Sequence, residues 1–185
     1  MRRALVALVA ACASTPAAST HHTPVPTVRS EIEAAETAEK ARRHDVARTH
    51  YEAAVAAAKD PESIAFARRE YAETLVTWGE VTAARAQLEI VVGVAPNDPS
   101  VWHDLGIIRH HEGDITGAIV ALGRAEELAP ADPRPRIALA ALYWKRGDKP
   151  AATREYQKLL EIDLPPQVRD KVKWALAQLT APPSP

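Results

Sequence analysis

The sequence predicts an all-α fold built from stacked pairs of helices. Equivalent residues recur at a spacing of 34, as Asp98-Pro99 and then Asp132-Pro133. The same spacing separates Gly79-Glu80 from Gly113-Asp114, and the latter from Gly147-Asp148. A fixed period of this length is typical of repeat proteins in which each unit is one supersecondary element stacked on the next. Apolar residues recur at helical spacing between these markers, so each unit is predicted to contain two helices.

The unit from 99 to 132 carries clear helix signals. Asp98 is a favourable N-cap, and Pro99 suits a first turn because its missing N–H would have no partner there. Gly113 is predicted to end the first helix, since glycine tolerates a positive φ, and Asp114 is predicted to cap the second. The apolar positions are Trp102, Leu105 and Ile108 on the first helix, and Ile115, Ala118, Ile119, Leu122 and Ala125 on the second.

The same signals place the other helices. The predicted ranges are 29–43, 45–59, 61–78, 80–94, 134–146, 148–162 and 167–179. The last helix follows Pro165-Pro166 and has one apolar side, formed by Val168, Val172, Ala175, Leu176 and Leu179. A stack of repeats leaves an apolar face uncovered at its end, so this helix is expected to act as a cap.

The central unit resembles the tetratricopeptide repeat (TPR). The matching residues are Trp102, Leu105, Gly106, Ala118, Ala125 and Pro130. The unit departs from the TPR signature at Arg109 and Leu122, where aromatic residues are usual or common. Gly106 and Ala118 are small where the two helices are expected to approach most closely. The following unit matches through Tyr143, Ala152 and Tyr156, the preceding one through Ala72, Ala84, Leu88 and Pro96, and the first through Ala35, Ala47, Tyr51 and Ala54.

The resemblance implies a right-handed α-solenoid of about four TPR-like helix pairs with a C-terminal capping helix. Its units would be 28–64, 65–98, 99–132 and 133–165, followed by the cap at 166–180 and a disordered tail at 181–185. In this family the first helices of the units line a concave surface that binds a partner. A fold alone implies no reaction, so the resemblance points to binding rather than to catalysis.

The resemblance also selects the residues that would line the concave groove. Carried onto this chain, they are Arg69, Glu73, Val76, His103, Ile107, His110, His111, Ile137, Ala141, Trp144 and Lys145. Such a mixed apolar and cationic surface is expected to bind an extended or helical peptide. Trp144 is the expected anchor, because aromatic residues dominate the energetics of binding in grooves. The alternative places Trp144 beneath the C-terminal helix as a packing residue.

The N-terminus has the features of a lipoprotein signal peptide. Arg2 and Arg3 precede an apolar run from 4 to 11, which is too short to span a bilayer. Val9-Ala10-Ala11-Cys12 resembles a bacterial lipobox, and Cys12 is the only cysteine. Residues 1–12 are therefore interpreted as a signal peptide ending in a lipid-modified cysteine. The alternative is ordinary cleavage that removes Cys12.

Residues 13–27 are rich in Ser, Thr, Pro and Ala and show no period, which predicts a flexible tether. Ala13 after the cysteine favours the outer membrane, by resemblance to enterobacterial sorting. The expected location is thus the bacterial cell envelope, as an outer-membrane lipoprotein facing the periplasm and held to the membrane by its lipid only. A soluble periplasmic or secreted protein is the alternative.

The sequence gives no support for catalysis, a cofactor or a metal site. His103 and His110 would share one helix face about 10 Å apart, too far to bind one metal together. A Gly-x-Ser-x-Gly motif and a Gly-rich phosphate loop are both missing from the sequence. The net charge of −1 and the pI near 6.7, without a basic stripe, argue against nucleic acid as a partner.

These observations predict a scaffold of the cell envelope that binds a peptide or helix of a partner protein and assists the assembly of an envelope complex. The alternative is a self-associating structural module whose groove holds its own tail or a second copy. A non-catalytic subunit of an enzyme is a third class. The oligomeric state is left open.

Overall fold

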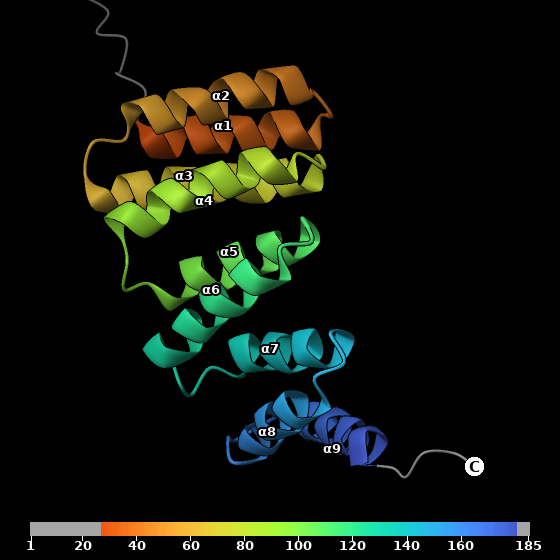
Figure 1. Cartoon of the computed structure of the whole chain (residues 1–185). Coiled ribbons are helices and arrows are strands. Elements are labelled where there is room, and N and C mark those ends of the chain that lie inside the picture. Colours follow the sequence, from red (N-terminus) through yellow and green to blue (C-terminus); the bar gives the residue numbers. More distant parts are fainter. Residues whose placement is uncertain (1–26, 181–185) are drawn as a thin grey trace, which may run out of the picture.

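The computed structural model describes residues 27–180. Its helices are α1 (Val28–Lys40), α2 (His44–Ala57), α3 (Pro61–Thr77), α4 (Val81–Val94), α5 (Pro99–His111), α6 (Ile115–Leu128), α7 (Pro133–Lys145), α8 (Lys149–Leu160) and α9 (Pro166–Thr180). Figure 1 shows them stacked from α1 at one end of the molecule to α9 at the other. The predicted all-α solenoid of four helix pairs with a further C-terminal helix is confirmed. Each helix begins and ends within about one turn of its predicted range.

Each pair consists of neighbouring antiparallel helices, and successive pairs pack through α2 on α3, α4 on α5, and α6 on α7. Alanines dominate the buried positions; Ala35, Ala47, Ala54, Ala67 and Ala84 are fully covered. Small side chains let helices approach closely, which is how the helices of a chain with 5% aromatic residues still pack tightly.

The helices of the central pair meet at Gly106 and Ala118, as predicted. Ala118 is fully buried, and a Cβ added at Gly106 would lie 2.6 Å from Leu122 Cγ and 3.2 Å from the Leu122 backbone nitrogen. Since a backbone atom cannot move aside as a flexible side chain can, α5 and α6 hold this spacing only with glycine at 106.

Each first helix ends in a turn with one residue in the left-handed region. Gly79, Gly113 and Gly147 have φ of 80°, 84° and 82°, and Arg42 occupies the equivalent place after α1 with φ of 57°. In all four turns the following residue's N–H returns to a carbonyl five residues back, for example Asp114 N to Arg109 O at 2.9 Å. This hydrogen-bond pattern is the Schellman motif, which prefers glycine because the left-handed conformation crowds a Cβ.

Aspartates begin several helices, as expected. The Asp98 carboxylate accepts a hydrogen bond from Ser100 N at 2.9 Å, and the Asp114 carboxylate accepts one from Gly117 N at 2.8 Å. Asp132 and Asp148 act in the same way on α7 and α8. These bonds satisfy N–H groups that have no partner inside the helix.

Two arginines connect neighbouring pairs. The Arg48 guanidinium of α2 donates to Glu80 Oε1 at 2.5 Å and lies 4.8 Å from the centre of the Trp78 ring. Farther along, the buried Arg136 of α7 pairs with Glu126 of α6 and lies 3.8 Å from Glu155 of α8. Removing either glutamate would leave the buried charge of Arg136 less compensated. These three side chains therefore hold α6, α7 and α8 in fixed relative positions.

The first helices of successive pairs are not evenly packed. α1 packs against α3 and α5 packs against α7, whereas α3 and α5 have no comparable contact. The stack is continuous at this point through α4, which packs on α5. The concave side is therefore open between α3 and α5.

The C-terminal helix covers the end of the stack. Val172, Ala175 and Leu179 of α9 are buried against a cluster that includes Tyr156 and Leu159 of α8. This is the packing that the apolar side of the helix predicted.

Within residues 27–180, none of the helices has both the length and the apolar composition needed to cross a membrane. The predicted lipidation at Cys12 and the predicted tail at 181–185 lie outside the described residues. The same holds for the predicted tether, apart from Thr27, which caps α1 through its side chain.

Candidate functional site: a groove between α3 and α5

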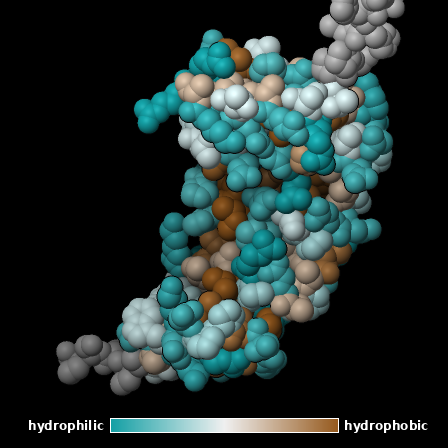
Figure 2. All heavy atoms as spheres, turned by 180° about the vertical axis from the view of Figure 1, so that it is seen from behind, coloured by the Kyte–Doolittle hydropathy of each residue, from teal (hydrophilic) through white to brown (hydrophobic). Residues whose placement is uncertain are grey.

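The opening between α3 and α5 forms a groove of about 970 Å³. Its apolar lining includes Phe66, Ala72, Val76, Val81, Leu88, Ile107 and Ile108. Figure 2 shows hydrophobic atoms in the hollowed middle of the face seen from behind, with hydrophilic atoms on either side. The volume lies at the upper end of the range for ligand sites in proteins, about 300–1,000 Å³. A space of this size and composition suits several apolar side chains of a bound segment.

The groove follows from the uneven packing of the repeats. Leu88 of α4 and Ile108 of α5 are buried core residues that also reach its surface, so the floor belongs to the core. Val76 of α3 is 38% exposed, which is unusual for an apolar residue facing a neighbouring helix. Since α5 does not cover it, Val76 is an apolar contact available to a partner.

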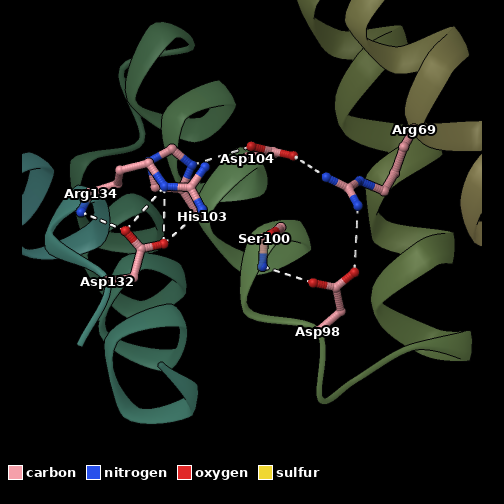
Figure 3. Close-up of polar contacts among 7 residues, drawn as sticks. All are labelled: Arg69, Asp98, Ser100, His103, Asp104, Asp132 and Arg134. Atoms are coloured by element: carbon pink, nitrogen blue, oxygen red, sulfur yellow. Dashed lines mark hydrogen bonds and ion pairs between the residues drawn. The ribbon is translucent and has the colours of Figure 1, made fainter. Parts of the chain in front are cut away.

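Arg69 is the polar link across this opening. Its guanidinium lies 3.5 Å from Asp98 Oδ2 and 3.4 Å from Asp104 Oδ2, which joins α3 to the start and middle of α5 (Figure 3). The other oxygen of Asp98 accepts the capping bond from Ser100. The pairs with Arg69 are long and about one-third exposed, so each contributes little to stability.

The polar contacts continue along the concave side toward α7. His103 Nδ1 lies 3.2 Å from Asp104 Oδ1, and the Asp132 carboxylate at the start of α7 pairs with Arg134 at 2.7 Å (Figure 3). Hydrogen bonding to the Arg134 side chain holds the pKa of Asp132 below its ordinary value. Asp104 and Asp132 are therefore already paired with other side chains of this protein.

The rim of the groove is predominantly acidic. The carboxylates that line it are Glu62, Glu70, Glu73, Asp98 and Asp104, and Arg69 is the one arginine or lysine among the lining residues. Burial raises the pKa of the Glu70 carboxyl above its ordinary value, and the nearby carboxylates of Glu73 and Glu36 raise that pKa further, against a smaller effect of Arg69. Negative charge is thus concentrated on α3, and Glu36 of α1 adds to it.

Six of the predicted groove residues line this cavity: Arg69, Glu73, Val76, His103, Ile107 and His111. The other five, His110, Ile137, Ala141, Trp144 and Lys145, lie outside its lining. The prediction thus selected residues of α3 and α5 that share one cavity, together with His110 of α5 and four residues of α7 that do not reach it. The prediction also described the surface as partly cationic. In the structure the positive charge of Arg69 is paired with two aspartates.

His110 and Lys145 contact each other away from the groove. Lys145 Nζ donates to His110 Nε2 at 3.2 Å, which requires an unprotonated imidazole nitrogen. Burial lowers the pKa of His110, and the positive charges of Lys145 and His111 lower it further. Among the residues described, no three His, Cys, Asp or Glu side chains come close enough to bind a metal ion together.

Trp144 lies in an aromatic cluster with the two helices that follow it. Its ring is edge-on to Tyr156 of α8 at 6.2 Å between ring centres and faces Trp174 of α9 at 6.3 Å. Trp174 is 62% exposed, so the cluster reaches the surface. This arrangement corresponds to the alternative interpretation, in which Trp144 packs beneath the C-terminal helix.

Sequence reasoning missed several lining residues. Phe66 and Glu70 stand three residues before Arg69 and Glu73, on the same face of α3, so helical spacing alone could have identified them. Leu88 and Ile108 gave no such signal, because a buried core residue and a groove floor have the same apolar pattern.

Two family models described as tetratricopeptide repeat match residues 72–133 and 110–174. The sequence has no match among curated proteins.

Solved structures resemble the chain in fold at low sequence identity. A crystal structure of the MamA protein is 16% identical with a TM-score of 0.69, covering 82% of this chain and 80% of that one. The Pseudomonas aeruginosa protein pilF is 14% identical with a TM-score of 0.63, covering 83% and 73%. The Yersinia enterocolitica type III secretion chaperone SycD, solved with a peptide of the translocator YopD, is 17% identical with a TM-score of 0.57, covering 60% and 88%. The repeat matches and the stacked helix pairs together show that the chain belongs to the tetratricopeptide repeat family.

Proposed function

We propose that this chain is a protein-interaction scaffold of the bacterial cell envelope, which holds a peptide or helix of a partner protein in the groove between α3 and α5. The observation that carries the proposal is the groove itself, an apolar cavity of about 970 Å³ with charged side chains around it. Apolar contacts supply affinity at such a site, and the charges orient the bound segment. Binding of a partner protein is also the general role of the family, whose members are mostly not enzymes.

The structural neighbours support a peptide as the occupant. SycD was solved in complex with a peptide of a translocator, and its fold matches 60% of this chain. At 17% identity this likeness concerns the fold and not the identity of the partner. The apolar floor and the exposed Val76 of this chain support the proposal independently of SycD.

The envelope location rests on the N-terminal sequence. Lipidation of Cys12 and a tether over 13–27 would place the solenoid in the periplasm at the outer membrane, where it assists the assembly of an envelope complex. Palmitate labelling of wild type and of Cys12→Ser tests this part: the label should be lost in the variant, which should become soluble. A wild-type protein without lipid would remove the envelope anchor from the proposal and leave the groove unaffected.

Site-specific photocrosslinking tests the groove. A benzophenone amino acid at Val76 should give a discrete crosslink to one partner, mapped by mass spectrometry to one segment of it. The matched control is the same amino acid at Val120, which is 62% exposed on α6 and lies outside the groove. Equal crosslinking from both positions would reject the groove as the binding site. A Val76 crosslink to a second copy of the chain would support the self-associating module instead.

A further inference from the structure

We propose that the segment bound in this groove is cationic and amphipathic, with apolar side chains on the floor between α3 and α5 and Lys or Arg side chains against the rim carboxylates. The inference rests on the proposed function, because it specifies the chemistry of the partner at that same site. It makes the groove selective for one class of peptide rather than for apolar segments in general.

The first argument is the charge balance of the lining. Five carboxylates stand against one guanidinium, since His103 and His111 are positive only when protonated. The guanidinium of Arg69 is shared between Asp98 and Asp104, so it is already committed within the chain. A bound anionic segment would therefore meet a net repulsive rim, whereas a cationic one would meet complementary charge.

The second argument is the crowding of carboxylates on α3. Glu70 and Glu73 are three residues apart on one face, and Glu36 of α1 adds a third negative charge. Like charges at this helical spacing destabilise a helix when nothing lies between them. A Lys or Arg side chain of a partner would relieve that repulsion on binding. The strongest complementarity should therefore lie at the α3 side of the groove.

The third argument is an aromatic ring at the edge of the groove. Phe66 lines the cavity, and the Arg29 guanidinium of α1 lies 5.8 Å from the centre of its ring. The edge of the groove at this ring thus already accepts a guanidinium, that of Arg29 in the chain itself. An apolar floor with acidic and aromatic edges fits a helix that has apolar residues at i, i+3/i+4 and i+7 and basic residues beside them.

The experiment measures the fluorescence anisotropy of two labelled model peptides on the full-length protein. Both carry the same apolar face, and one has Lys where the other has Glu. We expect the Lys peptide to bind at least about tenfold more tightly, because charge complementarity separates the two. The difference should shrink when the salt concentration is raised from about 0.05 to 0.5 M, since exposed ion pairs are screened.

Charge-neutralising variants locate the effect. Glu70→Gln/Glu73→Gln keeps side-chain size and should weaken binding of the Lys peptide by about tenfold, without altering the circular dichroism spectrum or lowering the melting temperature. The matched control is Glu52→Gln/Glu161→Gln, which removes two exposed carboxylates, one on α2 and one directly after α8, and should leave binding unchanged.

The outcomes separate the inference from the proposed function. Equal binding of the two peptides, or tighter binding of the Glu peptide, overturns the cationic partner and leaves peptide binding in place. If neither peptide binds and Val76 gives no specific crosslink, the proposed function fails as well.

Discussion

Glu70 illustrates how single residues of the groove trade stability for binding. The folded chain raises the pKa of its carboxyl through burial and through the neighbouring carboxylates, Glu73 first and then Glu36. A raised pKa means that the folded state holds a proton more tightly than the unfolded state does. Ionised Glu70 therefore costs stability. The penalty is absent below the ordinary pKa of 4.5 and grows as pH rises through the folded value.

Glu70→Gln should consequently raise the melting temperature at neutral pH, by up to about 3 °C for a chain of this length. The gain should disappear at about pH 4, where the carboxyl is protonated in both states. Thermal melts of the variant and wild type across this pH range check the prediction. Glu161→Gln, at an exposed position after α8, serves as the control and should show no gain at either pH.

Trp144 should contribute to stability rather than to binding, because its ring packs on Tyr156 and Trp174 and lies outside the groove. Trp144→Ala should lower the melting temperature by about 4–8 °C, as expected for about 2 kcal/mol of lost packing at a partly buried aromatic residue. Affinity for the Lys peptide should stay within about twofold of wild type. A tenfold loss of affinity with an unchanged melting temperature would instead show that the binding surface extends to α7.

At the scale of helices, the repeat turns explain why one unit departs from the others. The chain reverses after α3, α5 and α7 at glycines with positive φ, and after α1 at Arg42. Gly79, Gly113 and Gly147 are 34 residues apart, whereas Arg42 precedes Gly79 by 37. The turn of the first unit thus has the same geometry, with arginine in place of glycine. A non-glycine residue in the left-handed region costs about 1–2 kcal/mol.

Arg42→Gly should therefore stabilise the chain. About 0.5–1 kcal/mol of the relief is offset by the greater freedom of glycine in the unfolded state, which leaves a net gain of roughly 0.5–1 kcal/mol. Urea unfolding curves of the variant and wild type measure it. Arg43→Gly is the matched control, since Arg43 has φ of −101° and glycine relieves no strain there. A destabilised Arg42→Gly variant would show that the Arg42 side chain contributes more than its backbone strain costs.

At the scale of the whole molecule, the sequence predicted what depends on local chemistry. The period of 34, the Asp-Pro starts and the glycine turns each act within a few residues, so the number, order and limits of the helices could be read from them. The site was predicted only in part. Residues of α3 and α5 were found through their repeat positions, but the cavity exists because those two helices stay apart, which no local pattern encodes. Equivalent repeat positions also assigned both His110 and Trp144 to the groove, although His110 contacts Lys145 of α7 and Trp144 packs on Trp174 of α9.

Because the helix pairs stack in a line, loss of the last helix should affect the nearest helices most. α9 packs on α8, and its residues Val172, Ala175 and Leu179 belong to a cluster separate from the one that contains α1 to α4. In a solenoid each unit is stabilised mainly by its neighbours. Removing residues 166–185 should thus weaken α7 and α8 first.

Hydrogen exchange measured by mass spectrometry can resolve this effect along the chain. In the truncated protein, amides of α7 and α8 should exchange at least about tenfold faster than in wild type, because local opening costs less when a packed face is uncovered. Amides of α1 to α4 should keep their protection. Lys173→Ala, an exposed change on α9, controls for altered charge and should leave both regions unaffected. Uniformly faster exchange in all helices would mean that the solenoid unfolds as one unit, and that α9 stabilises the groove between α3 and α5 across the whole length of the stack.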